Sequence, residues 1–129
     1  MLKAKILVVE DEKDVRELIC YNLDKGGYET DTAFTGQMAL EKAIDDKPDL
    51  ILLDIMLPEI DGLEVCYNLK NNGETKSIPV VMLTAKSSEE DINKGLEMGA
   101  DGYITKPFSI RDLMTHIQTI LHQETLDAK

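Results

Sequence analysis

Five polar residues whose types could do chemistry stand at the ends of apolar or mixed segments of the chain. Glu10 and Asp11 follow the first of three runs of four apolar residues, Asp54 follows the second, and Thr84 follows the third. Lys106 follows a shorter mixed segment. If these segments are neighbouring parallel strands, about 4.8 Å apart, Asp11 and Asp54 face each other at one edge of a sheet. Lys106 then starts about 10 Å from Asp54, so only a long side chain that leans inward can reach it.

Carboxylates gathered at one strand edge would repel one another. Two such charges about 4 Å apart cost about 4 kcal/mol at an effective dielectric near 20, so a cation is expected beside them. Ligands that are all oxygen favour a hard ion, and Mg²⁺ is the expected one. Lys106 adds a second positive charge, and Thr84 adds a hydroxyl donor. Together these groups could hold a phosphoryl group, whose oxygens need a metal, an ammonium and a hydroxyl.

Each of these residues also has an ordinary structural interpretation. The acids at 10–12 could favour the N-terminal dipole of a helix. Asp54 and Thr84 could cap turns, and Lys106 could be a solvated surface lysine. The combination of all five residues favours a functional site, because each of them stands at the C-terminal end of an expected strand.

The elements that must position these residues alternate along the chain. The three continuous runs are apolar on both faces, as the inner strands of a parallel sheet require. Two further segments alternate or are mixed and indicate edge strands. The expected strands are residues 6–9, 28–33, 50–53, 80–83 and 102–105.

Helical spacing of apolar residues separates these strands. The stripes span residues 15–23, 39–44, 63–69 and 110–121, and Ser87-Ser88-Glu89-Glu90 is a capping-box pattern that begins a further helix ending at Gly99. The order is β-α repeated five times, which predicts an α/β class fold. We expect a doubly wound (βα)5 parallel sheet of five strands in the order 2-1-3-4-5, with helices on both faces. Ligands should bind at the switch point between strands one and three.

The charge of the chain excludes some classes of function. Its 129 residues carry 25 Asp and Glu against 14 Lys and Arg, a formal net charge of −11. The length suits one domain, and the negative charge disfavours direct contact with nucleic acid or anionic membranes. No apolar run approaches the roughly 20 residues of a membrane helix. Cys20 and Cys66 are expected as free, buried thiols, and the protein is expected to be cytoplasmic.

Four motifs occur in order along the chain. They are Ile6 to Glu12 (ILVVEDE), Leu53 to Pro58 (LDIMLP) with Asp61-Gly62, Leu83-Thr84-Ala85, and Gly99 to Phe108 (GADGYITKPF). Together they are very specific, and over about residues 4–122 the chain resembles the response-regulator receiver domains of two-component signalling. The resemblance implies a flavodoxin-like, three-layer fold. It makes residues 1–122 the receiver (phosphoacceptor) domain and leaves 123–129 as a C-terminal tail or the start of a linker.

The resemblance also implies a role for each acidic residue. Asp54 would be the phosphoacceptor, taking a phosphoryl group from the phosphohistidine of a sensor histidine kinase or of a histidine phosphotransfer protein. Glu10, Asp11, Asp54 and the backbone carbonyl of Met56 would hold Mg²⁺. Because phosphoryl transfer mostly needs alignment and charge neutralisation, a carboxylate can serve as the nucleophile.

The remaining motif residues would read out phosphorylation. Thr84 and Lys106 would contact the phosphoryl oxygens, and the Lys106–Pro107 peptide is typically cis in the family. Thr84 would move toward the phosphoryl group, and Tyr103 would swing inward into the freed space. The surface that changes would comprise helix four, strand five and helix five, which would control an output domain or protein.

The motif style is closest to that of receivers joined to winged-helix DNA-binding domains, as Met56-Leu57-Pro58 and Lys106-Pro107-Phe108 indicate. That subfamily usually has an arginine in helix five for a charged dimer interface. Thr115-His116 occupies this stretch here. The sequence therefore leaves open whether phosphorylation makes the chain dimerise.

Three other functions are less consistent with the residues. A Mg²⁺-dependent phosphatase with an aspartyl-phosphate intermediate would carry an acid at the position of Met56. A nucleotide carrier would need small and hydroxyl residues where the chain has Glu10-Asp11-Glu12, which would repel phosphate. A receiver that only binds partners would not need Asp54, Thr84 and Lys106. We expect a phosphoacceptor domain rather than an enzyme.

Overall fold

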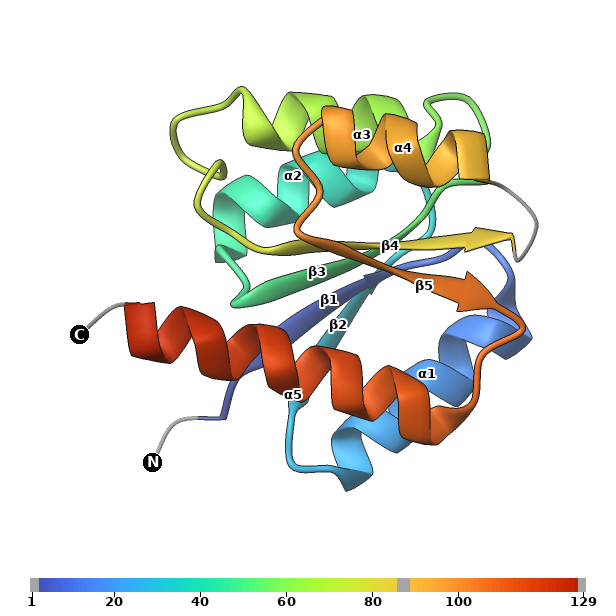
Figure 1. Ribbon diagram of the computed structural model, residues 1–129, viewed down its shortest axis with the longest axis vertical. Coiled ribbons are helices and arrows are strands. Elements are labelled where there is room, and N and C mark those ends of the chain that lie inside the picture. The colour runs from blue at the N-terminus through green and yellow to red at the C-terminus, as the bar shows by residue number, and fades with distance from the viewer. Residues whose placement is uncertain (1–2, 86–88, 128–129) are drawn as a thin grey trace.

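A sheet of five parallel strands lies between two layers of helices (Figure 1). The structure is a computed structural model, and it describes residues 3–85 and 89–127. The strand order is β2-β1-β3-β4-β5, as predicted, so the order reverses between β1 and β3. The strands are β1 (Lys5–Val9), β2 (Glu29–Ala33), β3 (Leu50–Asp54), β4 (Val80–Ala85) and β5 (Gly102–Lys106).

Helices cover both faces of this sheet. α1 and α5 lie on one face, and α2, α3 and α4 lie on the other (Figure 1). Among the described residues the helices are α1 (Lys13–Lys25), α2 (Gly36–Asp46), α3 (Gly62–Lys70), α4 (Glu89–Glu97) and α5 (Ile110–Asp127). The predicted (βα)5 doubly wound architecture is confirmed.

The inner strands bury their side chains alternately in two cores. In β1, Ile6 and Val8 pack against α1 and α5, whereas Leu7 and Val9 pack in the core under α2 and α3. All four side chains are at most 1% exposed. A strand that is buried on both faces needs an apolar residue at every position, which explains the continuous apolar runs. Burial of each such side chain stabilises the fold by about 1.5–3 kcal/mol.

Side-chain caps mark where several helices begin. Thr35 Oγ1 accepts a hydrogen bond at 3.1 Å from the amide three residues on, and Asp61 Oδ1 accepts one at 2.9 Å. Ser109 does the same at the start of α5, at 3.0 Å. These bonds satisfy amides that have no partner within the helix. The expected capping box of α4 begins at Ser87 and Ser88, which lie outside the described residues.

Several element boundaries differ from the sequence prediction by a few residues, and two of these differences have a clear physical reason. β2 begins at Glu29 rather than Tyr28, because the Tyr28 N–H donates to the Leu23 carbonyl at 3.0 Å and so closes the end of α1. α5 continues to Asp127, beyond residue 122, where a tail was expected. Gln, Glu and Leu in this stretch are favourable helix residues. The division between receiver and tail stays a prediction.

Both cysteines are free, but their surroundings differ. Cys66 is buried as expected, and burial raises the pKa of its thiol to about 11. Cys20 is only half-buried, and burial raises its pKa as well. Across the described part of the chain, no helix is both long enough and apolar enough to cross a membrane.

Candidate functional site

The carboxylates of Glu10, Asp11 and Asp54 come together at the C-terminal edge of the sheet. One oxygen from each lies within 4.8 Å of the other two. The pairing of Val9 with Leu53 places the residues that follow β1 beside the end of β3. The expected convergence at the switch point between these strands is therefore present.

Glu10 is the most enclosed of the three acids. It is 1% exposed, and its N–H donates to the Ala33 carbonyl at 3.0 Å, which ties it to β2. Its Oε2 accepts from the Glu12 N–H at 3.1 Å. Burial, reinforced by the neighbouring Asp54 carboxylate, raises the pKa of Glu10 to about 7. The Glu10 side chain thus also satisfies the amide of Glu12, directly before α1.

Lys106 reaches Asp54 from two strands away and Glu10 from three. Its Nζ lies 3.1 Å from Glu10 Oε1 and 3.1 Å from Asp54 Oδ2. Burial alone would lower the pKa of Lys106, but the Asp54 and Glu10 carboxylates raise it above its usual value. The interpretation of Lys106 as a solvated surface lysine is therefore wrong. The Lys106–Pro107 peptide is cis, as expected.

Asp54 is held on both of its carboxylate oxygens. Oδ2 accepts a hydrogen bond from the Lys106 ammonium. Oδ1 accepts one from the Met56 N–H at 3.1 Å, so Asp54 also caps the turn after β3. The residue is 3% exposed. Gly62 packs against the backbone here, and a Cβ at this position would overlap the Asp54 carbonyl oxygen. Only glycine lets α3 begin this close to the acid.

Thr84 ends the buried part of β4, one residue beyond the register partner of Asp54. It is 2% exposed, and within the described ranges its Oγ1 has no hydrogen-bond partner. A buried hydroxyl without a partner costs about 1–3 kcal/mol, so this atom is poised to accept or donate a bond. Thr84 lies on the same face of the sheet as Met82, because side chains alternate along a strand.

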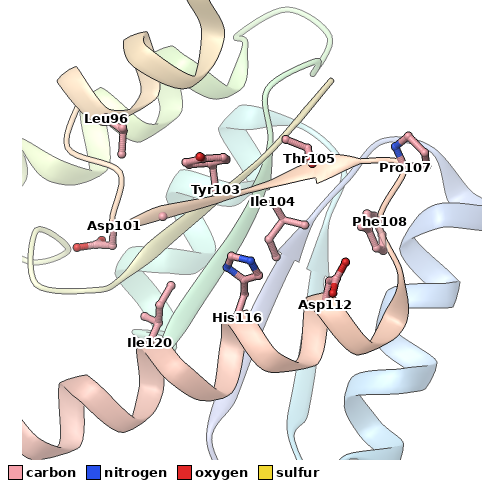
Figure 2. A pocket seen from close by; sticks show the side chains of 11 residues that line it. Leu96, Asp101, Tyr103, Ile104, Thr105, Pro107, Phe108, Asp112, His116 and Ile120 are labelled. Atoms are coloured by element: carbon pink, nitrogen blue, oxygen red, sulfur yellow. The ribbon is translucent and has the colours of Figure 1, made fainter. Parts of the chain in front are cut away.

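Tyr103 stands on that face too, since it pairs in register with Met82 on the neighbouring strand. It is 40% exposed. Figure 2 shows its ring above β5, on the side of Leu96 from α4. His116 and Ile120 of α5 point toward β5 from below. These residues line a groove of about 490 Å³ along β5 and α5.

A second cleft of about 550 Å³ opens beside Asp11. It is lined by Asp11, Met56, Asp61 and Lys94, with five further residues from the β3–α3 loop, α3 and α4. The Met56 side chain is 75% exposed at its mouth. The cleft therefore opens to solvent beside Asp11, the exposed acid of the three.

Arg16 is a neighbour of the site that the sequence analysis missed. Its Nη1 donates to the Glu10 carbonyl at 2.9 Å and to the Asp11 carbonyl at 3.3 Å. Its partners are backbone atoms, which leave no trace in the pattern of side-chain types. The available signal was a basic residue one turn into the helix that follows the acids.

The donor set suits a hard divalent ion. Its three carboxylates supply only oxygen, which Mg²⁺ prefers, and one of them, Asp11, is exposed and leaves room for bound water. Lys106 already offsets part of the negative charge. The residues present therefore fit the expected metal.

A doubly wound sheet that gathers three acids, a lysine and a buried hydroxyl at the C-terminal edge of its strands defines an α/β protein with a site suited to a cation and an anionic group. Residues 6–118 match the model of the response regulator receiver domain, and the chain belongs to that family. It is thus a receiver domain of two-component response regulators.

Known proteins resemble the chain over nearly all of its length. It is 47% identical over 127 residues to the alkaline phosphatase synthesis transcriptional regulatory protein PhoP of Bacillus subtilis (strain 168). That alignment covers 98% of this chain and 52% of PhoP, so the chain spans about half the length of this curated relative.

Solved structures share the fold. The chemotaxis response regulator CheY4 of Vibrio cholerae is 33% identical, with a TM-score of 0.87, over 92% of this chain and 99% of that one. A CheY-like receiver domain protein from Methanospirillum hungatei JF-1 is 29% identical, with a TM-score of 0.91, over 98% of this chain and 99% of that one.

Proposed function

We propose that Asp54 is the phosphoacceptor of this receiver domain. The donor is the phosphohistidine of a sensor histidine kinase or of a histidine phosphotransfer protein. The observation that carries the proposal is the convergence of buried Asp54 with Glu10, Asp11 and Lys106 at the sheet edge. These charged groups come from three strands, and the mutual repulsion of the acids makes their gathering costly unless they share a chemical role.

The transfer is a single displacement at phosphorus. The P–N bond of the donor breaks, a P–O bond to an Asp54 carboxylate oxygen forms, and the imidazole nitrogen leaves with the electron pair. The Met56 N–H and the Lys106 ammonium hold the carboxylate in a fixed orientation. Since the transition state is loose, this alignment and the positive charge of Lys106 are the main contributions of the chain.

Glu10, Asp11 and Asp54, with the Met56 backbone carbonyl, hold Mg²⁺ in this proposal. When bound, the ion supplies positive charge that offsets the charge on the phosphoryl oxygens. The Thr84 hydroxyl, which has no hydrogen-bond partner among residues 3–85 and 89–127, donates to one phosphoryl oxygen. Lys106 then shares its ammonium between the acids and the phosphoryl group.

The experiment that tests this proposal is intact-mass measurement after incubation with Mg²⁺ and phosphoramidate, whose P–N bond mimics that of phosphohistidine. The native chain should gain one phosphoryl group, and Asp54→Asn should gain none. Asp31→Asn, a matched control in the middle of another strand of the sheet, should label like the native chain. Equal labelling of Asp54→Asn and the native chain would falsify the assignment of Asp54.

We also propose that Thr84 and Tyr103 form the switch. Both lie on the α4 side of the sheet, and their strands are neighbours. Movement of Thr84 toward a phosphoryl group frees space that the half-exposed Tyr103 ring fills. The surface formed by α4, β5 and α5, with the groove of Figure 2, changes as a result and controls an output domain or protein. Structures with and without beryllofluoride should show two Tyr103 rotamers; one shared rotamer would contradict the switch.

The proposed partners follow from this role. The chain receives its signal from the kinase in the cytoplasm and passes it to an output partner, without touching nucleic acid or membrane itself. A phosphorylation-dependent dimer through the α4-β5-α5 surface is a further proposal. The PhoP relative is a transcriptional regulatory protein, which supports an output in transcription. The chain acts as a phosphoacceptor rather than a turnover enzyme, because Met56 stands where aspartyl-phosphate phosphatases carry an acid.

A further inference from the structure

Arg16 holds the turn from which two of the acids project. A single nitrogen, Nη1, bridges the carbonyls of Glu10 and Asp11 at 2.9 and 3.3 Å. The residue sits one turn into α1, and its own N–H donates to the Glu12 carbonyl at 3.0 Å. Arg16 therefore joins α1 to both peptide units at the end of β1.

Phe34 holds the guanidinium in place. The Arg16 Cζ lies 5.2 Å from the centre of the Phe34 ring, which is within the range of a cation–π contact. Phe34 follows β2, and the preceding Ala33 carbonyl accepts from the Glu10 N–H. The turn after β1 is thus fixed on one side by β2 and on the other by Arg16 and Phe34.

The three acids depend on this turn to different degrees. The side chains of Glu10 and Asp54 are enclosed and are held by Lys106. Asp11 is exposed, and within residues 3–85 and 89–127 its carboxylate has no hydrogen-bond or ion-pair partner. Its place within 4.8 Å of the other acids therefore rests on its backbone, which Arg16 binds through the carbonyl.

We propose that Arg16 is a positioning residue for the metal site and that Phe34 supports it. By fixing the backbone of the turn, Arg16 keeps the Asp11 carboxylate aimed at Asp54 before a divalent ion arrives. Residues that orient metal ligands in this way commonly change metal affinity 10–100-fold. The inference rests on the proposed metal set of Glu10, Asp11 and Asp54.

Positioning and simple electrostatics predict opposite signs. The guanidinium is a cation close to the acids, so its charge alone opposes the approach of Mg²⁺. Loss of that charge would tighten Mg²⁺ binding, whereas loss of positioning weakens it. The direction of the change in Kd therefore separates the two effects.

The experiment is a titration of the unphosphorylated full chain with Mg²⁺, followed by calorimetry and by the amide resonances of the site. We expect Arg16→Met to raise the Mg²⁺ Kd about tenfold, the lower end of the range for such residues. Arg16→Lys keeps one donor nitrogen but loses the stacking on Phe34, so its Kd should lie between those of the native chain and Arg16→Met. Arg111→Met, at the other arginine of the chain, is the matched control and should leave the Kd unchanged.

A second measurement separates positioning from folding. In phosphoramidate labelling, Arg16→Met should need more Mg²⁺ for half-maximal rate, with a nearly native rate at saturating Mg²⁺. An unchanged or lower Kd in Arg16→Met, or an equal rise in Arg111→Met, would overturn the inference. A native chain that does not bind Mg²⁺ would instead refute the proposed metal site itself.

Discussion

Replacement of Lys106 by Met should destabilise the chain by about 2 kcal/mol in the absence of divalent ions. The Lys106 ammonium lies 3.1 Å from carboxylate oxygens of both Glu10 and Asp54, which are 1% and 3% exposed. Without it, two carboxylates within 4.8 Å of each other repel by about 3 kcal/mol at an effective dielectric of 20, and protonation of Glu10, whose pKa is about 7, relieves part of this repulsion. The lysine side chain is 32% exposed, so water screens part of this effect.

Urea unfolding at neutral pH, followed by circular dichroism because the chain has no tryptophan, measures this change. Mg²⁺ should restore more stability to Lys106→Met than to the native chain, since it supplies the missing positive charge to the folded state. The lost free energy should therefore shrink as Mg²⁺ is added.

Lys42→Met is the matched control for this variant. Lys42 Nζ lies 2.9 Å from Asp31 Oδ1, but both side chains are about one-third exposed. The loss should be about 0.5–1 kcal/mol and should not depend on Mg²⁺. If Lys106→Met lost no more than this control, or if Mg²⁺ left its loss unchanged, the charge balance that we derive for the site would be incorrect.

Two further predictions concern residues outside the acid cluster. Burial alone would raise the pKa of Asp31, but hydrogen bonds from Lys42 and from the Thr32 N–H lower it below its usual value. Asp31→Asn should therefore lower the free energy of unfolding at neutral pH, and this loss should vanish as the pH falls through the folded-state pKa. Urea midpoints measured against pH test this. Gly62→Ala should lower the free energy of unfolding by about 2–3 kcal/mol in the same assay, because the added Cβ overlaps the backbone at the end of β3. Gly73→Ala, which has open space around it, should change this free energy by no more than about 0.5 kcal/mol. Equal losses in the two variants would contradict the packing argument.

The sequence predicted the strand order and the acid cluster because both follow from side-chain type. Runs that are apolar at every position must be inner strands, and the acids after them must share one edge. Lys106 followed from the same logic, since its strand ends at that edge and its side chain is long. Contacts made by backbone atoms could not be predicted in this way. Arg16 on two carbonyls and the closure of α1 by the Tyr28 N–H belong to this class.

The state of Thr84 was also beyond the sequence. A threonine at a strand end is compatible with a cap, a turn or a free hydroxyl, and only the packing around it decides. The structure buries it to 2% exposure with no partner among the described residues. The extension of α5 to Asp127 was missed because a polar segment carries no apolar stripe, even when its residues favour a helix.

The pairing of Lys106 with acids 52 and 96 residues earlier has a consequence for biosynthesis. Protein chains leave the ribosome from the N-terminus, so all three acids emerge long before the lysine that pairs with Glu10 and Asp54. A nascent chain cannot assemble this pocket until its fifth strand has been made and has joined the sheet. Competence to receive a signal therefore arises late, and truncated products that lack the final strand cannot have it.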